Sequence, residues 1–182
     1  MTVRRGFGEG SSPAIQGDTL IVTWDHQGES FIVALDRTTG KEKWRTAREE
    51  ITSWTTPLIV AIGDGYQVVT SATERVRGYD LETGNLLWES PGLTLNAIPS
   101  PVAAEGVVFV TSGYRGSVVY AVQLDRARGD LTGGDAIVWS GDRDTPYVPS
   151  PLLYDGTLYL IKGNSGILSA IDAKSGERNY IE

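Results

Sequence analysis

Cysteine is absent from this 182-residue chain, and histidine occurs once. Without cysteine there is no disulfide, no thiolate metal site and no cysteine nucleophile. A Ser-His-Asp triad would have to use His26, and no G-x-S-x-G sequence accompanies that residue. One histidine without cysteine also leaves too few ligands for a typical transition-metal site. These absences weigh against triad hydrolases and against zinc enzymes.

Basic charge and long apolar runs are scarce as well. The chain has 16 Lys and Arg against 23 Asp and Glu, a formal net charge of -7, so it lacks the basic excess that phosphate backbones require. Nucleic acid is therefore not an expected partner. No run reaches the roughly 18 apolar residues of a membrane helix, and residues 1–12 lack the apolar centre of a signal peptide. We expect no membrane span, while the compartment stays open, and the chain is either a mature product or a fragment.

Helical periodicity is also missing, which excludes alternating βαβ folds. A Ser-Pro or Thr-Pro pair recurs instead, with its prolines at 13, 57, 101 and 151, and these spacings of 44, 44 and 50 residues define four units. Each unit holds about four short strands rich in β-branched and aromatic residues, which is typical of a propeller blade. We therefore predict one all-β propeller module over residues 1–182. Its four-stranded antiparallel blades are expected at about 9–50, 51–92, 93–144 and 145–182.

A second motif marks the hairpin between the third and fourth strands of a unit. It reads ALDRTTGKEKW at 34–44, GYDLETGNLLW at 78–88 and AIDAKSGERNY at 170–180. We expect the Asp to accept hydrogen bonds from the turn, the Gly to supply a positive φ, and the aromatic residue to cover the neighbouring blade. The polar atom of that aromatic residue should find a backbone partner. The predicted structural positions are Asp36, Gly40, Trp44, Asp80, Gly84, Trp88, Trp139, Asp172, Gly176 and Tyr180.

The third unit departs from this pattern. Asp125 and Trp139 are 14 residues apart, against 8 between the matching residues of the other units, so the hairpin loop gains six residues. An Arg128-Gly129-Asp130 triplet lies in that loop. A Gly-rich hairpin extension explains the triplet as well as an adhesion motif does, and the lengthened loop marks either a contact surface or a tolerated insertion.

The pattern D-x-x-[TS]-G-x-x-x-[WY] resembles the tryptophan-docking motif of the pyrroloquinoline-quinone (PQQ)-type propeller repeat, over about residues 8–180. The resemblance implies a ring of seven or eight blades and an extracytoplasmic or periplasmic location. The family includes quinone-dependent alcohol and sugar dehydrogenases and also outer-membrane assembly lipoproteins that bind no quinone. The dehydrogenases hold their quinone with a vicinal Cys pair, a Trp, a Ca²⁺ set of Glu and Asn, and a catalytic Asp. The Cys pair is absent here.

We therefore expect a non-catalytic module without a cofactor, acting as a binding or assembly scaffold for a protein, peptide or glycan. One alternative is part of a PQQ- and Ca²⁺-dependent dehydrogenase, and another is a purely structural module of a larger secreted protein. Oxygen ligation of calcium by Asp25, Glu29, Asp142 or Asp144 also stays open.

Strand direction sorts the loops into two faces. The loops after the second strands, together with the connections between blades, share one face, and there the units differ from one another. Such variation is what a ligand surface would show, because packing alone asks each unit for the same residues. The candidate ligand residues on this face are His26, Trp54, Arg75, Asn96, Arg115, Asp144, Tyr147 and Asn164.

Four blades leave a ring incomplete, and an open half-ring exposes apolar blade faces. Two copies could close an eight-bladed ring by self-association, the remaining blades could belong to a longer parent chain, or four blades could close by themselves. The sequence alone leaves these three arrangements open.

Overall fold

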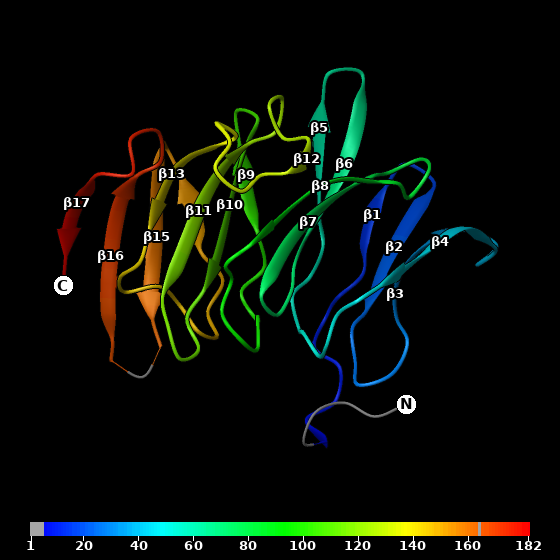
Figure 1. The fold of residues 1–182 in the computed structure, drawn as a ribbon, viewed down its shortest axis with the longest axis horizontal. Helices are drawn as coiled ribbons and strands as arrows, with labels where there is room; N and C mark the ends of the chain where they lie inside the picture. The colour runs from blue at the N-terminus through cyan, green and yellow to red at the C-terminus, as the bar shows by residue number, and fades with distance from the viewer. Residues whose placement is uncertain (1–5, 164) are drawn as a thin grey trace.

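A computed structural model describes residues 6–163 and 165–182, and Figure 1 shows its β-sheets standing side by side. The first blade holds β1 (Ala14–Gln16), β2 (Thr19–Trp24), β3 (Ser30–Asp36) and β4 (Glu42–Arg48), and the second holds β5 (Leu58–Ile62), β6 (Gly65–Ser71), β7 (Arg75–Asp80) and β8 (Leu86–Pro91). The third holds β9 (Val102–Ala104), β10 (Val107–Ser112), β11 (Val118–Gln123) and β13 (Ile137–Gly141). The short strand β12 (Gly129–Asp130) lies in the loop between β11 and β13. The fourth holds β14 (Leu152–Tyr154), β15 (Thr157–Lys162), β16 (Ile167–Asp172) and β17 (Arg178–Ile181).

Within each blade the strands pair antiparallel in chain order, which confirms the predicted all-β propeller of four-stranded blades. The innermost strands converge, since β1 contacts β5 and β9 contacts β14. The first and fourth sheets stand at opposite ends of the row in Figure 1, so the four blades do not close a ring by themselves. Among the described residues, no helix is both long and apolar enough to cross a bilayer.

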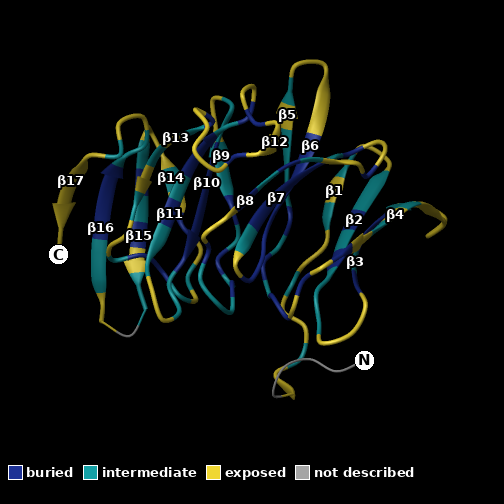
Figure 2. Ribbon diagram, in the orientation of Figure 1, coloured by how far each residue is buried: buried dark blue, intermediate teal, exposed yellow. Residues whose placement is uncertain are grey.

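The hydrophobic core lies between successive blades. Ile21 and Ile32 of the first blade pack with Val68 and Tyr79 of the second, and similar clusters join the second blade to the third and the third to the fourth. Figure 2 shows the middle strands buried, while β17 and the first residues of β4 are exposed. Each blade is therefore stabilised mainly by burying its faces against its neighbours.

The predicted hairpin turn is confirmed. In the first blade, Asp36 Oδ1 accepts hydrogen bonds from the N–H groups of Thr38 at 3.1 Å and Thr39 at 2.7 Å, and from the Thr39 hydroxyl at 2.8 Å. The bonds from Thr39 lower the pKa of Asp36 below its ordinary 3.8. The turns at Asp80 and Asp172 repeat these bonds. The turn glycines have φ values of 70°, 74° and 76°, as the sequence predicts.

The aromatic residue after each turn docks on the next blade at two of the three interfaces. Trp44 Nε1 donates to the Leu81 carbonyl at 2.9 Å, and Trp139 Nε1 donates to the Ala173 carbonyl at 2.9 Å. A Cβ on Gly84 would overlap the Trp44 ring. The turn glycine therefore meets two demands, a positive φ and room for the tryptophan of the preceding blade.

Trp88 corrects the expectation that each aromatic residue bonds to a backbone atom of the next blade. Its Nε1 donates to Gln67 Oε1 of the same sheet at 2.9 Å, and its side chain is completely buried. The third blade lacks the Asp-Gly turn that would accept it. Tyr180, in the last strand, is 45% exposed.

The lengthened loop of the third blade takes the place of the missing turn. Its strand β12 pairs in parallel with β8, with Gly129 opposite Trp88, so the loop adds a fifth strand to the sheet of the second blade. Leu131 of the same loop packs in the cluster that contains Trp88. The Arg128 guanidinium donates to carbonyls within the loop, and Asp130 accepts bonds from Thr132. The lengthened loop is thus an intramolecular contact between blades.

The Ser-Pro and Thr-Pro pairs form a row of hydrogen bonds across the blades. Ser12 N donates to Thr56 Oγ1 at 3.1 Å, and Thr56 N donates to Ser100 Oγ at 3.0 Å. Ser100 N then donates to Ser150 Oγ at 3.1 Å. The following proline restricts each of these residues to extended backbone, which orients its N–H toward the next blade. The motif that defines the repeat in the sequence therefore also links the repeats in space.

Two glycine variants separate turn geometry from tryptophan docking. Gly40 and Gly84 both have positive φ, but a Cβ meets nothing within 4 Å at Gly40 and meets Trp44 at Gly84. We expect Gly40→Ala to destabilise the chain by about 1–2 kcal/mol through backbone strain, and Gly84→Ala by about 1–3 kcal/mol more because the ring must move. Urea unfolding of the two variants measures the difference. Equal losses would show that Trp44 does not dock on Gly84.

Candidate functional site

The face that carries the β2–β3, β6–β7, β10–β11 and β15–β16 loops together with the connections between blades is the lower one in Figure 1, and we refer to it as the connector face. It contains a hollow of about 460 Å³. The chain lead-in, the three connections between blades (residues 49–57, 92–101 and 142–151) and the β10–β11 loop all contribute. The residues that line the hollow are Phe7, Gly10, Trp54, Leu95, Asn96, Ile98, Tyr114, Arg115 and Tyr147.

Four of the eight candidate ligand residues meet in this hollow, namely Trp54, Asn96, Arg115 and Tyr147. They come from four different segments of the chain, and the fold brings them to one place because every connection returns to the same face. Their role in binding stays a prediction.

The aromatic lining is ordered by contacts among its own members. The rings of Tyr114 and Tyr147 lie with centroids 4.9 Å apart and planes 31° apart. The Arg115 guanidinium lies 5.3 Å from the centre of the Tyr114 ring, within the range of a cation–π contact. Trp54 Nε1 donates to the Gly8 carbonyl at 2.8 Å. The hollow thus presents an aromatic surface of two rings in contact, with one cation beside it.

Buried hydroxyl groups hold the connections in place. Trp54 N donates to the Ala97 carbonyl at 2.9 Å, which joins two successive connections directly. Thr73 Oγ1 donates to the Thr52 carbonyl at 3.0 Å and accepts from Asn96 N at 3.1 Å. Thr145 Oγ1 likewise donates to the Ser112 carbonyl at 2.8 Å. Each connection is therefore fixed to the end of a strand or to its neighbour.

Two residues of the lining have a backbone conformation that L-residues rarely adopt. Asn96 and Arg115 both have φ of 55°. Such conformations destabilise the backbone by roughly 1–3 kcal/mol and are often found at functional sites. Here they lie on two separate segments that face the same hollow.

Three of the other four candidates lie outside the hollow. His26 Nδ1 accepts the Gly28 N–H at 2.9 Å within its own turn, and Arg75 pairs with Glu89 at 3.1 Å. Asp144 accepts bonds from Lys162 and Arg178, each at 3.0 Å, and these bonds lower its pKa below the ordinary 3.8. Asn164 lies outside the described residues.

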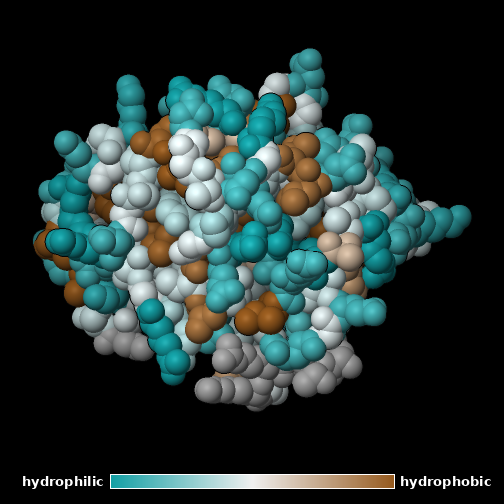
Figure 3. All heavy atoms as spheres, in the orientation of Figure 1, coloured by the Kyte–Doolittle hydropathy of each residue, from teal (hydrophilic) through white to brown (hydrophobic). Residues whose placement is uncertain are grey.

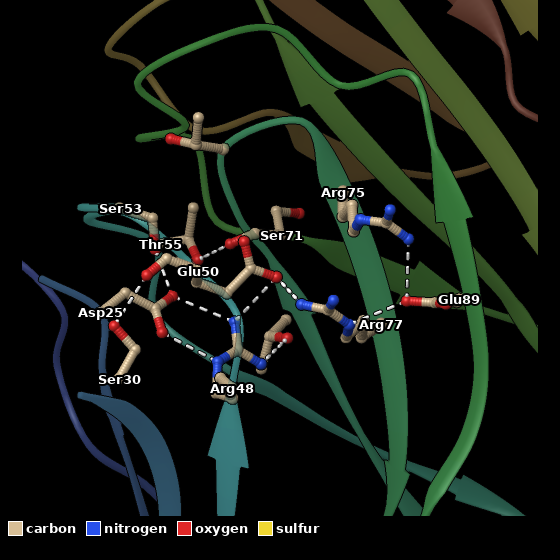
Figure 4. Close-up of polar contacts among 12 residues, drawn as sticks. Asp25, Ser30, Arg48, Glu50, Ser53, Thr55, Ser71, Arg75, Arg77 and Glu89 are labelled. Carbon is tan, nitrogen blue, oxygen red and sulfur yellow. Dashed lines mark hydrogen bonds and ion pairs between the residues drawn. The ribbon is translucent and has the colours of Figure 1, made fainter. Parts of the chain in front are cut away.

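A buried ionic network, which no motif in the sequence predicts, lies between the first and second blades (Figure 4). Asp25 accepts two hydrogen bonds from Arg48, at 2.8 and 3.0 Å, and one from Ser53 Oγ at 2.6 Å. Arg48 Nη1 donates to Thr70 at 2.9 Å and to the Tyr79 hydroxyl at 2.8 Å. Because Ser53 precedes Trp54, the network anchors the connection that carries this lining residue.

Further ion pairs extend from Asp25 and Arg48 across the second blade. Glu50 pairs with Arg77, and Arg77 Nε donates to Glu89 at 3.0 Å. Burial alone would lower the pKa of Arg48, but the attraction of Asp25 and Tyr79 and the hydrogen bonds to both together outweigh burial and raise this pKa. Burial also raises the pKa of Tyr79, partly offset by the nearby Arg48. The network is recognisable only in three dimensions, since its charged residues come from separate strands and loops of two blades.

The calcium alternative does not fit the arrangement of acidic side chains. Asp25 faces the guanidinium of Arg48, so its carboxylate is already neutralised. Residues 6–163 and 165–182 contain no group of three or more His, Cys, Asp or Glu placed to hold a metal ion. Among the described residues that line the hollow, none carries a carboxylate, although Ca²⁺ sites are built on carboxylate and carbonyl oxygens. We therefore derive no chemistry through calcium.

Comparison with known proteins places these features in context. Residues 1–180 match the family described as outer membrane protein assembly factor BamB. The protein of that name from Francisella salina is 27% identical over 170 residues, which are 93% of this chain and 30% of the relative. The one from Francisella tularensis is 24% identical over 163 residues, 90% of this chain and 33% of the relative. The chain thus spans about a third of the length of these curated relatives.

Solved structures show the same fold. The crystal structure of BamB from Moraxella catarrhalis matches with a TM-score of 0.63 and 20% identity, over 94% of this chain and 52% of that one. The quinohemoprotein alcohol dehydrogenase from Comamonas testosteroni matches with a TM-score of 0.69 and 13% identity, over 96% of this chain and 35% of that one. Because these identities are low, the structural matches establish the propeller fold and leave function to other observations.

A double-mutant cycle on Asp25 and Arg48 tests the buried pair, whose side chains are 3% and 0% exposed. We expect Asp25→Leu to lower the free energy of unfolding by about 3–5 kcal/mol, because it leaves the buried Arg48 charge with only Glu50, 4.0 Å away. The double variant Asp25→Leu/Arg48→Met should lose clearly less than the sum of its single variants. Urea unfolding gives these free energies. If each single variant loses less than about 1 kcal/mol of unfolding free energy, and the double variant loses the sum of the two, the pair is not buried as described.

Proposed function

This chain belongs to the family of PQQ-type repeat propellers that includes the outer membrane protein assembly factor BamB, and we propose that it is a non-catalytic scaffold whose connector face binds a protein partner. The sequence relatives carry the name of an assembly factor, which supports an assembly role over an enzymatic one. The chain covers only about a third of those relatives, so the partner of the whole protein is part of the proposal.

The observation that carries the proposal is the convergence of every connection on one aromatic hollow. The face opposite the connector face carries the repeated hairpin turns, in which the Asp side chain accepts hydrogen bonds from its own turn. The connector face instead joins residues that differ between blades, and it holds them with hydrogen bonds between connections. Aromatic residues such as Tyr114 and Tyr147 are enriched in protein interfaces.

The proposal extends to location and assembly. We place the protein outside the cytoplasm, a location that the name of the relatives, outer membrane protein assembly factor, supports. The first and last blades are completed either by further blades of a parent chain or by self-association. The outer face of the fourth blade supports such completion, because Leu152, Tyr154 and Tyr180 are 61%, 71% and 45% exposed.

Site-specific photo-crosslinking in the cells that make the protein tests this function. The photoreactive residue p-benzoylphenylalanine would replace Tyr147 on the connector face or, as the control, Tyr66, which is 37% exposed beside the β5–β6 turn on the opposite face. Both changes replace one aromatic residue by another. We expect a product joined to a second protein from position 147 and little from position 66, because only the connector face holds a partner. Equal yields at both positions, or a product from position 66 alone, would contradict the proposal.

A further inference from the structure

We propose that the hollow takes an extended segment of a protein partner in which a large apolar side chain stands next to a carboxylate. This inference rests on the proposed function and specifies the chemistry that the connector face recognises. Three observations carry it: the apolar lining, the single cation at its side and the fixed position of the loop that bears this cation.

The lining is mainly apolar. Its aromatic residues are joined by Leu95 and Ile98 from one connection, and by Phe7 from the lead-in, which is 73% exposed. The volume of about 460 Å³ lies within the roughly 300–1,000 Å³ that is usual for ligand pockets. Exposed apolar surface of this kind is rare on proteins unless it binds something. On the side of the molecule that Figure 3 shows, apolar residues form separate small areas among polar ones.

The charge at the hollow selects a carboxylate. Arg115 is the one charged residue of the lining, and among the described residues no Asp or Glu forms an ion pair with it. Other arginines of the connector face, such as Arg75 and Arg143, each pair with a carboxylate of this chain. In a chain of net charge -7, a cation beside apolar surface and without an acidic partner is complementary to an acidic group on the ligand.

The loop that carries Arg115 is already placed for binding. Tyr114 N donates to Thr94 Oγ1 at 3.2 Å, which ties the β10–β11 loop to the preceding connection. On the other side a Cβ at Gly113 would overlap the backbone of Pro146, so the loop lies directly against the following connection. A cation held in this way loses little freedom on binding, which favours affinity.

A peptide fits this lining better than a glycan does. Sugars are recognised through many directed hydrogen bonds to their hydroxyl groups, together with stacking on an aromatic ring. Here the indole N–H of Trp54 is already bonded to Gly8, and Leu95 and Ile98 offer no polar group. An apolar side chain flanked by a carboxylate uses both the aromatic surface and Arg115.

Peptide binding to the purified protein tests the inference. The probe is fluorescein-labelled Gly-Ser-Glu-Phe-Glu-Ser-Gly, measured by fluorescence anisotropy. We expect saturable binding that weakens at least about tenfold when both Glu are replaced by Gln, or when Phe is replaced by Ser, because each change removes one of the two recognised groups. Arg115→Gln should weaken binding of the parent peptide by a similar factor. The control variant Arg126→Gln removes the same charge from a 54% exposed side chain in the hairpin loop of the opposite face and should leave binding unchanged.

Several results would overturn the inference. These are binding that is insensitive to the Glu replacements, an equal effect of Arg115→Gln and Arg126→Gln, or binding of a soluble oligosaccharide in place of the peptide. If the peptides fail while Tyr147 still gives a specific crosslink, the inference is wrong and the proposed function stands. If the crosslink also fails, the proposed function is wrong as well.

Discussion

The contact on which the arrangement of this molecule depends is the docking of a tryptophan on the glycine turn of the next blade. Trp44 and Trp139 each place an indole ring where a Cβ would otherwise stand, and each donates a hydrogen bond to the turn it covers. A single glycine therefore sets both the shape of its own hairpin and the distance to the preceding blade. Once the blades are stacked in this way, their innermost strands converge, and the Ser and Thr residues before the prolines fall within hydrogen-bond distance of one another.

The third blade shows how the fold accommodates the loss of that contact. Its hairpin lacks the Asp-Gly turn, and Trp88 of the preceding blade bonds to Gln67 and is completely buried. The six additional residues form a loop whose strand pairs with β8 and whose Leu131 packs in the same cluster as Trp88. At the interface between the second and third blades, a different segment thus takes the place of the missing turn. An insertion that looks like surface variation in the sequence has a structural role.

The repeats made the fold predictable from the sequence. The site was harder to predict, because its residues do not recur from one repeat to the next. Four copies of one pattern fixed the blades, because the same local geometry had to explain each copy. The pairing of Asp25 with Arg48 could not be predicted, because the two residues are 23 positions apart and neither belongs to the repeat. Variation between units drew attention to Trp54, Asn96, Arg115 and Tyr147, which meet in the hollow. Variation between units also pointed to His26 and Asp144, but His26 accepts a hydrogen bond from Gly28 and Asp144 accepts one from Lys162. Sequence variation does not show which way a loop side chain points.

Contacts between blades hold the connections rigid as a binding surface. Amide hydrogen exchange followed by NMR tests this claim at single residues in a protein of 19.7 kDa. The decisive amides are those of Trp54, Thr56 and Ser100, which donate to a neighbouring connection or blade. If the account is right, they exchange about as slowly as amides in the buried strand β7. Exchange as fast as in the exposed loop at residues 132–135 would show that the connections are mobile, and it would contradict the account.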